Sequence, residues 1–289
     1  MTAPLPDPDS FLSGESGAVA GKKLTIARTA ADWGLELAGL AALTGPRLDR
    51  LAARQAPRRV LVLSIYRPGS LLPRTAPRLR SERHDVTFAL GATGAPEPAL
   101  AGATVLGDLA GGKFENLNRL LAAAAPLESH DWLIVADDDI ELAPRFLDRA
   151  LALCERLELD VAQPAQTMRS HAAWRVTRRR PLSLARRTDY VEIGPVTLFA
   201  RRAAAELTPF PELRFGWGLD NHWAALARER GWRLGILDAL PVRHESQQVA
   251  STYARADAIE EARRFLAGRP YVTTAEAQRT LETIRRLPS

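Results

Sequence analysis

The ten residues LIVADDDIEL, at positions 133–142, place three carboxylates directly after an apolar run. A short apolar run that breaks off in this way is typical of a buried β-strand. Aspartate is a poor strand former and adjacent like charges repel, so Asp137, Asp138 and Asp139 mark the end of the strand. Two explanations fit the triplet: a solvated turn that leads into the next helix, or a site where a positive group offsets the charge.

Apolar runs and amphipathic segments alternate along the chain on both sides of this stretch. The predicted strands are 58–66, 85–90, 103–107, 131–136, 160–165, 189–202 and 232–240, and the predicted helices are 112–126, 143–159 and 221–231. Such alternation predicts an α/β fold with a mostly parallel sheet flanked by helices. In sheets of this kind ligands bind at the carboxyl ends of the strands, which is where the aspartate triplet falls.

The aspartate triplet and the net charge of the chain favour a metal ion and an acidic ligand at the carboxyl ends of the strands. Carboxylates at one strand end can hold Mg²⁺ or Mn²⁺, and such a cation would offset their repulsion and bind phosphate oxygens. The net charge of +5 over 289 residues suits an acidic ligand. Cys154 is the one cysteine, so an intrachain disulfide and a cysteine-based metal cluster are excluded, and a reducing compartment is the simplest inference.

Both ends of the chain differ in character from its middle. Residues 1–21 lack the pattern of a signal peptide and predict disorder, because they are rich in Pro, Gly, Ser and Asp. Residues 22–45 predict an amphipathic helix that packs on the body. Charged residues interrupt it, so it cannot span a bilayer, but a helix on the membrane surface behind Lys22 and Lys23 is the alternative. Residues 253–289 predict two polar helices. We expect a cytoplasmic protein with at most peripheral membrane contact.

The segment 168–187 carries seven arginines. It fits a solvated loop, a mobile lid over a diphosphate, or a dock for an anionic acceptor. A nucleic-acid partner is disfavoured, because Trp174 is the one aromatic residue in the run and no nucleic-acid motif accompanies it.

The order of these features resembles glycosyltransferases with the GT-A fold that use nucleotide sugars, and family 2 in particular. Three features carry the resemblance: the Asp-x-Asp at the strand end, GGKFENLNRLLAAA at 111–124, and GWGLDNHWAALARERGWRLGILDALPVRH at 216–244. It spans roughly residues 57–245. A weaker likeness, to a plant family of uncharacterised glycosyltransferase-like proteins, depends on QPA, YVEIGPVTLFARRA and GWGLD. The segment YVEIGPV departs from the usual family 2 pattern, so we expect an unusual acceptor site.

The resemblance implies a Rossmann-like GT-A catalytic domain at 57–250, between an N-terminal part at 1–56, disordered and then helical, and a helical extension at 251–289. It also implies roles for five residues. Asp139 binds the metal directly and His244 completes the metal shell. Asp137 contributes to the metal site and faces the ribose or base, and Asp138 lies near the diphosphate or the sugar. Asp220 is the general base, although an N-cap role would also explain it. Glu212 is a weaker competitor, and His222 is an acceptor-site or structural residue.

Six further residues are candidates for binding the nucleotide sugar. Tyr66 and Arg67 follow the first strand, where the base would bind, although Tyr66 also fits a strand-edge aromatic. Lys113, Asn116 and Asn118 open a helix, where phosphate is favoured, although a plain amphipathic helix explains them equally. Trp217 is a sugar platform or a core residue.

These inferences predict a metal-dependent enzyme of the hexosyltransferase type, which moves a sugar from a nucleotide-diphosphate sugar to an acceptor hydroxyl with inversion. The alternative is a non-catalytic protein of the same fold that binds a nucleotide sugar or glycan. A dehalogenase-type phosphatase does not fit, because Glu141 stands where that family needs Thr or Val.

Overall fold

The computed structural model describes residues 4–13, 22–170, 172–244 and 254–287, with residues 22–25 as backbone alone. The described helices are α1 (Lys22–Ala41), α2 (Thr44–Ala52), α3 (Leu72–Thr75), α4 (Lys113–Ala123), α5 (Phe146–Arg156), α6 (Arg201–Leu207), α7 (Leu219–Arg230), α8 (Arg255–Leu266) and α9 (Thr274–Ala277). The described strands are β1 (Arg59–Tyr66), β2 (Asp85–Ala92), β3 (Thr104–Leu106), β4 (Trp132–Ala136), β5 (Ile140–Glu141), β6 (Val161–Gln166), β7 (Ala185–Thr188), β8 (Val196–Ala200), β9 (Leu234–His244) and β10 (Thr280–Ile284).

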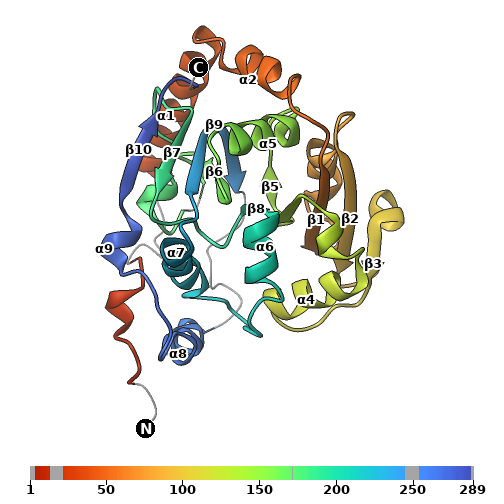
Figure 1. The fold of residues 1–289 in the computed structure, drawn as a ribbon, viewed down its shortest axis with the longest axis vertical. Helices are drawn as coiled ribbons and strands as arrows, with labels where there is room; N and C mark the ends of the chain where they lie inside the picture. Colours follow the sequence, from red (N-terminus) through yellow and green to blue (C-terminus); the bar gives the residue numbers. More distant parts are fainter. Residues whose placement is uncertain (1–3, 14–21, 171, 245–253, 288–289) are drawn as a thin grey trace.

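The described strands form one sheet, in the order β10-β7-β9-β6-β8-β4-β1-β2-β3, with β5 paired to β9 (Figure 1). Strands β1 to β4 run parallel, and β6 is parallel to β9. Strand β8 is antiparallel to β4 and β6, β5 and β7 are antiparallel to β9, and β10 is antiparallel to β7. Seven of the ten described strands, all except β5, β7 and β8, therefore point one way. The structure confirms the predicted fold class, an α/β fold with a mostly parallel sheet flanked by helices.

The central strands are apolar throughout because helices cover both faces of the sheet. In β1 and β4, Leu61 and Leu133 pack in one cluster with side chains of α4, α6 and α7. Their neighbours Val62 and Ile134 point to the other face and pack with α5 and α2. This two-sided burial holds the carboxyl ends of β1 and β4 side by side, with Leu63 paired to Val135.

The Arg-rich segment is built into the sheet at its C-terminal end, which corrects the prediction of a single loop or lid. Residues 185–188 form β7, and the guanidinium group of Arg186 is fully buried against the carboxylate of Asp238 in β9, at 2.8 Å. Arg186 also donates to the backbone carbonyl oxygens of Val176 and Arg178. A buried pair with its remaining protons bound to carbonyl oxygens fixes the path of this segment.

Three further expectations are corrected. In the predicted strand 189–202, only Val196–Ala200 is a strand, and α6 begins at Arg201. The C-terminal tail holds α8 and the short α9, but then adds β10 to the sheet instead of a second long helix. Disorder is wrong for residues 4–13: Phe11 is buried in the core, and the hydroxyl of Ser10 lies 3.1 Å from that of Tyr271. The remaining residues of the predicted disordered stretch lie outside the described part.

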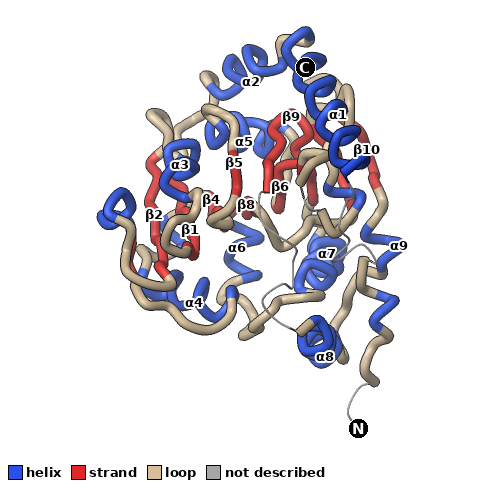
Figure 2. Tube along the Cα trace, turned by 180° about the vertical axis from the view of Figure 1, so that it is seen from behind, coloured by secondary structure: helices blue, strands red, loops and turns tan. Residues whose placement is uncertain are grey.

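Helices α1 and α2 lie at the same end of the molecule as the C-terminus, and α8 lies at the opposite end (Figures 1 and 2). Among the described residues, none of the helices combines the length and the apolar character needed to cross a bilayer.

The buried ion pair predicts an asymmetry between two adjacent arginines. Arg186→Ala leaves the carboxylate of Asp238 buried without its cation, so we expect the free energy of unfolding to fall by about 3–5 kcal/mol. Arg187→Ala is the matched control, since Arg187 is partly exposed and its nearest carboxylate, on Glu282, is 3.7 Å away. Its expected loss is about 0.5 kcal/mol. Urea denaturation measures both, and equal losses would contradict the structural role of the pair.

Candidate active site

Each carboxylate of the aspartate triplet lies close to a basic side chain. Asp137 accepts a hydrogen bond from the ammonium group of Lys113 at 2.5 Å. Asp138 accepts from the backbone N–H of Arg67 at 2.8 Å and from its guanidinium group at 3.2 Å. Asp139 lies 3.0 Å from Nε2 of His244. Side chains from three places therefore reduce the repulsion between the three carboxylates: the start of α4, the residue after β1, and the end of β9.

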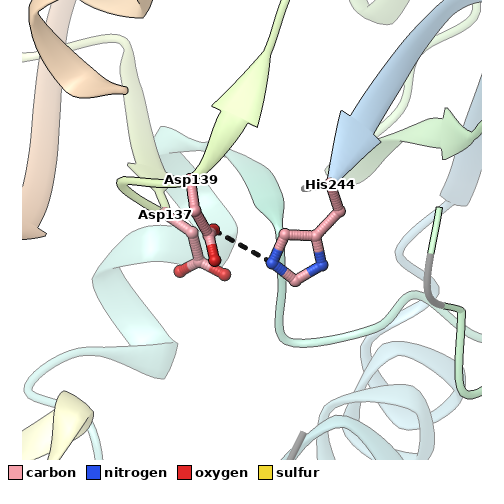
Figure 3. A group of neighbouring side chains, drawn as sticks. All are labelled: Asp137, Asp139 and His244. Atoms are coloured by element: carbon pink, nitrogen blue, oxygen red, sulfur yellow. Dashed lines mark ion pairs between the residues drawn. The ribbon is translucent and has the colours of Figure 1, made fainter. Parts of the chain in front are cut away.

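His244 reaches Asp139 because β5 pairs antiparallel with β9, with Ile140 opposite His244. Figure 3 shows Asp139 at the start of β5 and His244 facing it from the end of β9. Burial by itself would lower the pKa of His244. The hydrogen bond to Asp139 and the charges of Asp137 and Asp139 outweigh burial and raise this pKa above its ordinary value.

Asp137, Asp139 and His244 form a candidate metal site. One ligand atom from each of the three lies within 4.8 Å of the others. Two carboxylate oxygens and an imidazole nitrogen suit Mn²⁺, and carboxylates also suit Mg²⁺. The residues present therefore fit the divalent cation that the sequence predicts.

A cavity of about 200 Å³ adjoins this group. It brings together side chains from distant parts of the chain, and its wall includes Lys113, Asp137, Gln166, Trp174, Glu192, Trp217, Asp220 and His244. The N-terminal residues Phe11, Leu12 and Ser13 also line it. The candidate metal ligands Asp137 and His244 and the candidate base Asp220 thus face one space.

Asp220 lies in the first turn of α7 and is 6% exposed. Its carboxylate accepts hydrogen bonds from the hydroxyl of Tyr190 and from the backbone N–H of Asn221. Burial raises the pKa of Asp220 to about 6, and these hydrogen bonds act against that rise. The N-cap alternative is wrong, because Gly218 occupies the N-cap position and Asp220 is the second residue of the helix.

Glu192 is a cavity residue that sequence reasoning did not single out. Its carboxylate accepts a hydrogen bond from the side-chain amide of Gln166 at 2.7 Å. Burial raises the pKa of Glu192 to about 8, and the charge of Asp220 acts in the same direction. The signal was present in the sequence, because Glu192 lies in YVEIGPV, the segment that departs from the family 2 pattern.

Two of the candidate nucleotide-binding residues are used inside the protein instead. Tyr66 is fully buried and its hydroxyl lies 2.8 Å from that of Thr104. The prediction that its ring stacks on the nucleotide base is therefore wrong. Asn118 donates to the carbonyl oxygen of Phe210 and accepts from the N–H of Phe210, so both ends of its amide are used.

Other candidates are placed as follows. Asn116 is buried and accepts from Arg119, and it is not among the residues of the cavity wall. Arg67 and Asp138 are bound to each other. Lys113 and Trp217 line the cavity, as the predicted roles require.

The competitors of Asp220 lie elsewhere. Glu212 is exposed and borders a different hollow, next to α8. His222 has Nδ1 2.7 Å from the carbonyl oxygen of Pro270 and packs edge-on against the ring of Phe265, which assigns it a structural role.

No protein-family model matches the sequence, and no curated protein matches it. A search of solved structures finds similar chains at low identity. One is GalNAc-T7 with UDP, GalNAc and Mn²⁺, which is 13% identical with a TM-score of 0.47 over 67% of this chain and 44% of that one. Another is S. aureus TarS 1-349 in complex with UDP-GlcNAc, which is 14% identical with a TM-score of 0.48 over 71% of this chain and 64% of that one. This chain spans less than two thirds of the length of each.

The ligand set predicts specific metal binding. We expect the full chain to bind Mn²⁺, and His244→Ala to weaken the binding about tenfold or more, because one of three protein ligands is lost. Isothermal titration calorimetry with MnCl₂ measures this. Asp85→Ala, at the exposed amino end of β2, is the control and should bind as the wild type does. Equal affinities for His244→Ala and wild type would rule out this ligand set.

Proposed function

We propose that this chain is a metal-dependent GT-A glycosyltransferase, which moves a sugar from a nucleotide-diphosphate sugar to an acceptor hydroxyl with inversion at the anomeric carbon. One observation carries the proposal: Asp137 and His244, two of the three candidate metal ligands, line the same cavity as Asp220, a buried carboxylate. A glycosyl transfer needs both parts. A cation stabilises the departing diphosphate, and a base at the other side of the sugar accepts the acceptor's proton.

The donor half of the site lies at the end of β4. Asp137, Asp139 and His244 would hold the metal, which when bound supplies positive charge to the diphosphate oxygens. Lys113 lines the same cavity from the start of α4, which supports a role for its ammonium group in binding a phosphate oxygen. Trp217, also in the cavity wall, offers an aromatic face to the C–H face of a pyranose.

The choice of base follows from the two acids in the cavity. The pKa of Asp220 is about 6 and that of Glu192 is about 8, so near pH 7 Asp220 is mostly ionised and Glu192 mostly protonated. Acid–base sites commonly separate the pKa values of two neighbouring acids in this way. Asp220 therefore accepts the proton, and neutral Glu192 remains bound to Gln166.

The reaction then balances as a single displacement. The acceptor O–H bond breaks and its proton passes to the carboxylate of Asp220. The acceptor oxygen forms a bond to the anomeric carbon on the face away from the diphosphate. The bond from that carbon to the diphosphate oxygen breaks, and the nucleoside diphosphate leaves with the electron pair. The rings of Phe11, Trp174 and Phe215 line the cavity wall and would limit the access of water to a bound acceptor.

Donor hydrolysis tests the proposal directly. The full chain is incubated with UDP-, GDP- and dTDP-sugars, with and without MnCl₂, and released nucleoside diphosphate is measured. We expect slow, metal-dependent hydrolysis of one donor, because water can replace a missing acceptor. In Asp139→Ala the rate should fall by about a hundredfold or more, since the cation supplies several kcal/mol to the transition state.

Asp85→Ala is again the matched control and should keep the wild-type rate. Metal-dependent donor binding without turnover, even with sugar and lipid acceptors added, would support the non-catalytic alternative. Absence of both binding and turnover would exclude the proposed function.

The role of Asp220 predicts the acid side of the pH profile. The ionised carboxylate is the active form, so kcat/KM should fall as pH drops through about 6. The hydrogen bond from Tyr190 stabilises the ionised form and so lowers this pKa. Tyr190→Phe should therefore move the acid limb to higher pH. Tyr66→Phe removes a buried hydroxyl outside the cavity wall and should leave the limb in place. An unshifted limb in Tyr190→Phe would argue against Asp220 as the base.

A further inference from the structure

Among the described residues, exposed apolar side chains are most numerous on helix α1 and just after it. Among the described residues nine large hydrophobic side chains are exposed, and five of them lie between positions 26 and 43: Ile26, Trp33, Leu37, Leu40 and Leu43. Ile26, Trp33, Leu37 and Leu40 are 63–71% exposed. At 100° per residue these four fall within an arc of about 60° on α1. They form a continuous apolar stripe that faces solvent.

Helix α1 is attached to the body through a different face, and by charge. The buried carboxylate of Asp32 accepts from the backbone N–H groups of Met168 and Arg169, at 2.8 and 3.1 Å. Glu36 forms an ion pair with Arg179 at 2.5 Å. An amphipathic helix of a globular protein ordinarily buries its apolar stripe. Here the acidic side chains hold the helix in place, so the stripe is left for a partner outside the described chain.

A basic groove follows the helix in the chain. The groove has a volume of about 870 Å³, and its wall combines four leucines with six arginines: Arg47, Arg50, Arg54, Arg156, Arg285 and Arg286. No carboxylate of the described residues lies within ion-pair distance of Arg47, Arg50, Arg54, Arg285 or Arg286. Five positive charges in one groove without such a carboxylate favour an anionic partner.

The stripe and the groove lie at the same end of the molecule, where Figures 1 and 2 place α1, α2 and the C-terminus. Leu182, which is 76% exposed, lies in the sequence between a residue that contacts α1 and a residue that lines the groove. It lies three residues after Arg179, the partner of α1, and two residues before Leu184, which lines the groove. We call the stripe, Leu182 and the groove together the α1–α2 face.

We propose that the α1–α2 face docks this protein on the surface of an anionic lipid bilayer. A helix lying in the interface would insert the stripe among the acyl chains, while the arginines bind lipid phosphates. Tryptophan at position 33 suits the boundary between headgroups and acyl chains. A second copy fits less well, because a two-fold dimer over this face would bring two sets of six arginines together.

The segment that α1 contacts also contributes to the cavity wall. Asp32 binds the N–H groups of Met168 and Arg169, Glu36 binds Arg179, and Trp174, which lies between them in the sequence, lines the cavity.

Flotation of the full chain with lipid vesicles tests the proposal. The vesicles are phosphatidylcholine alone, or phosphatidylcholine mixed with phosphatidylglycerol. We expect binding to the mixed vesicles only, weakened by high salt. Trp33→Ser/Leu37→Ser and Arg285→Glu/Arg286→Glu should each raise the lipid concentration for half-maximal binding about tenfold or more.

Two double variants are matched controls away from this face. Leu5→Ser/Val105→Ser removes exposed apolar side chains near the N-terminus and on β3, and Arg255→Glu/Arg264→Glu makes the same charge change on α8. Both should bind as the wild type does, and circular dichroism confirms that every variant is folded. The proposal is overturned if the wild type does not bind the mixed vesicles or if the test variants bind unchanged. A dimer that becomes monomeric in Trp33→Ser/Leu37→Ser without vesicle binding would identify a second copy as the occupant instead.

Discussion

Three adjacent carboxylates at the end of one strand are the constraint on which the site depends. They are tolerated because three separate elements each deliver a basic side chain: Lys113 from α4, Arg67 from the residue after β1, and His244 from β9. The strand order makes this possible, since β8 and β6 lie between β4 and β9, and β5 then crosses to pair with β9. The contact between Asp139 and His244 therefore depends on the strand order. If β9 lay elsewhere in the sheet, Asp139 would have no imidazole beside it.

The three carboxylates are not equivalent, and the difference separates structure from function. Asp138 is 8% exposed and is held by three hydrogen bonds from Arg67, and its carbonyl oxygen accepts from the N–H of Leu71. It fixes the turn after β4. Asp137 and Asp139 lie on either side of it and come together with His244. An alternating pattern of this kind explains why an Asp-x-Asp spacing, with the middle residue turned away, suits a site for a cation.

The sequence predicted the elements whose side chains follow one simple period. Strands β1 and β4 are apolar runs, and α5 repeats apolar residues on one face, so their burial is encoded locally. Strand β7 reads ARRT and escaped prediction, because the partner that buries Arg186 is Asp238, 52 residues away. The candidate metal ligands Asp137, Asp139 and His244 were predicted from the resemblance to GT-A glycosyltransferases. The burial of Tyr66 and the use of Asn118 depend on Thr104 and Phe210, contacts that no local pattern records.

The segment 190–195 explains why the two halves of the site form one unit. At its start, Tyr190 donates to the carboxylate of Asp220. At its end, the carbonyl oxygen of Pro195 accepts from the N–H of Asp137, and a side chain at Gly194 would meet the Asp137 carboxylate at 3.0 Å. Between them, Glu192 is fixed by Gln163 and Gln166 of β6. Six residues therefore connect the candidate metal ligand to the candidate base. Both ends of the segment are bound to the groups that they help to position, so its irregular path, which the apolar pattern of 189–202 did not predict, contributes to the separation of the two groups.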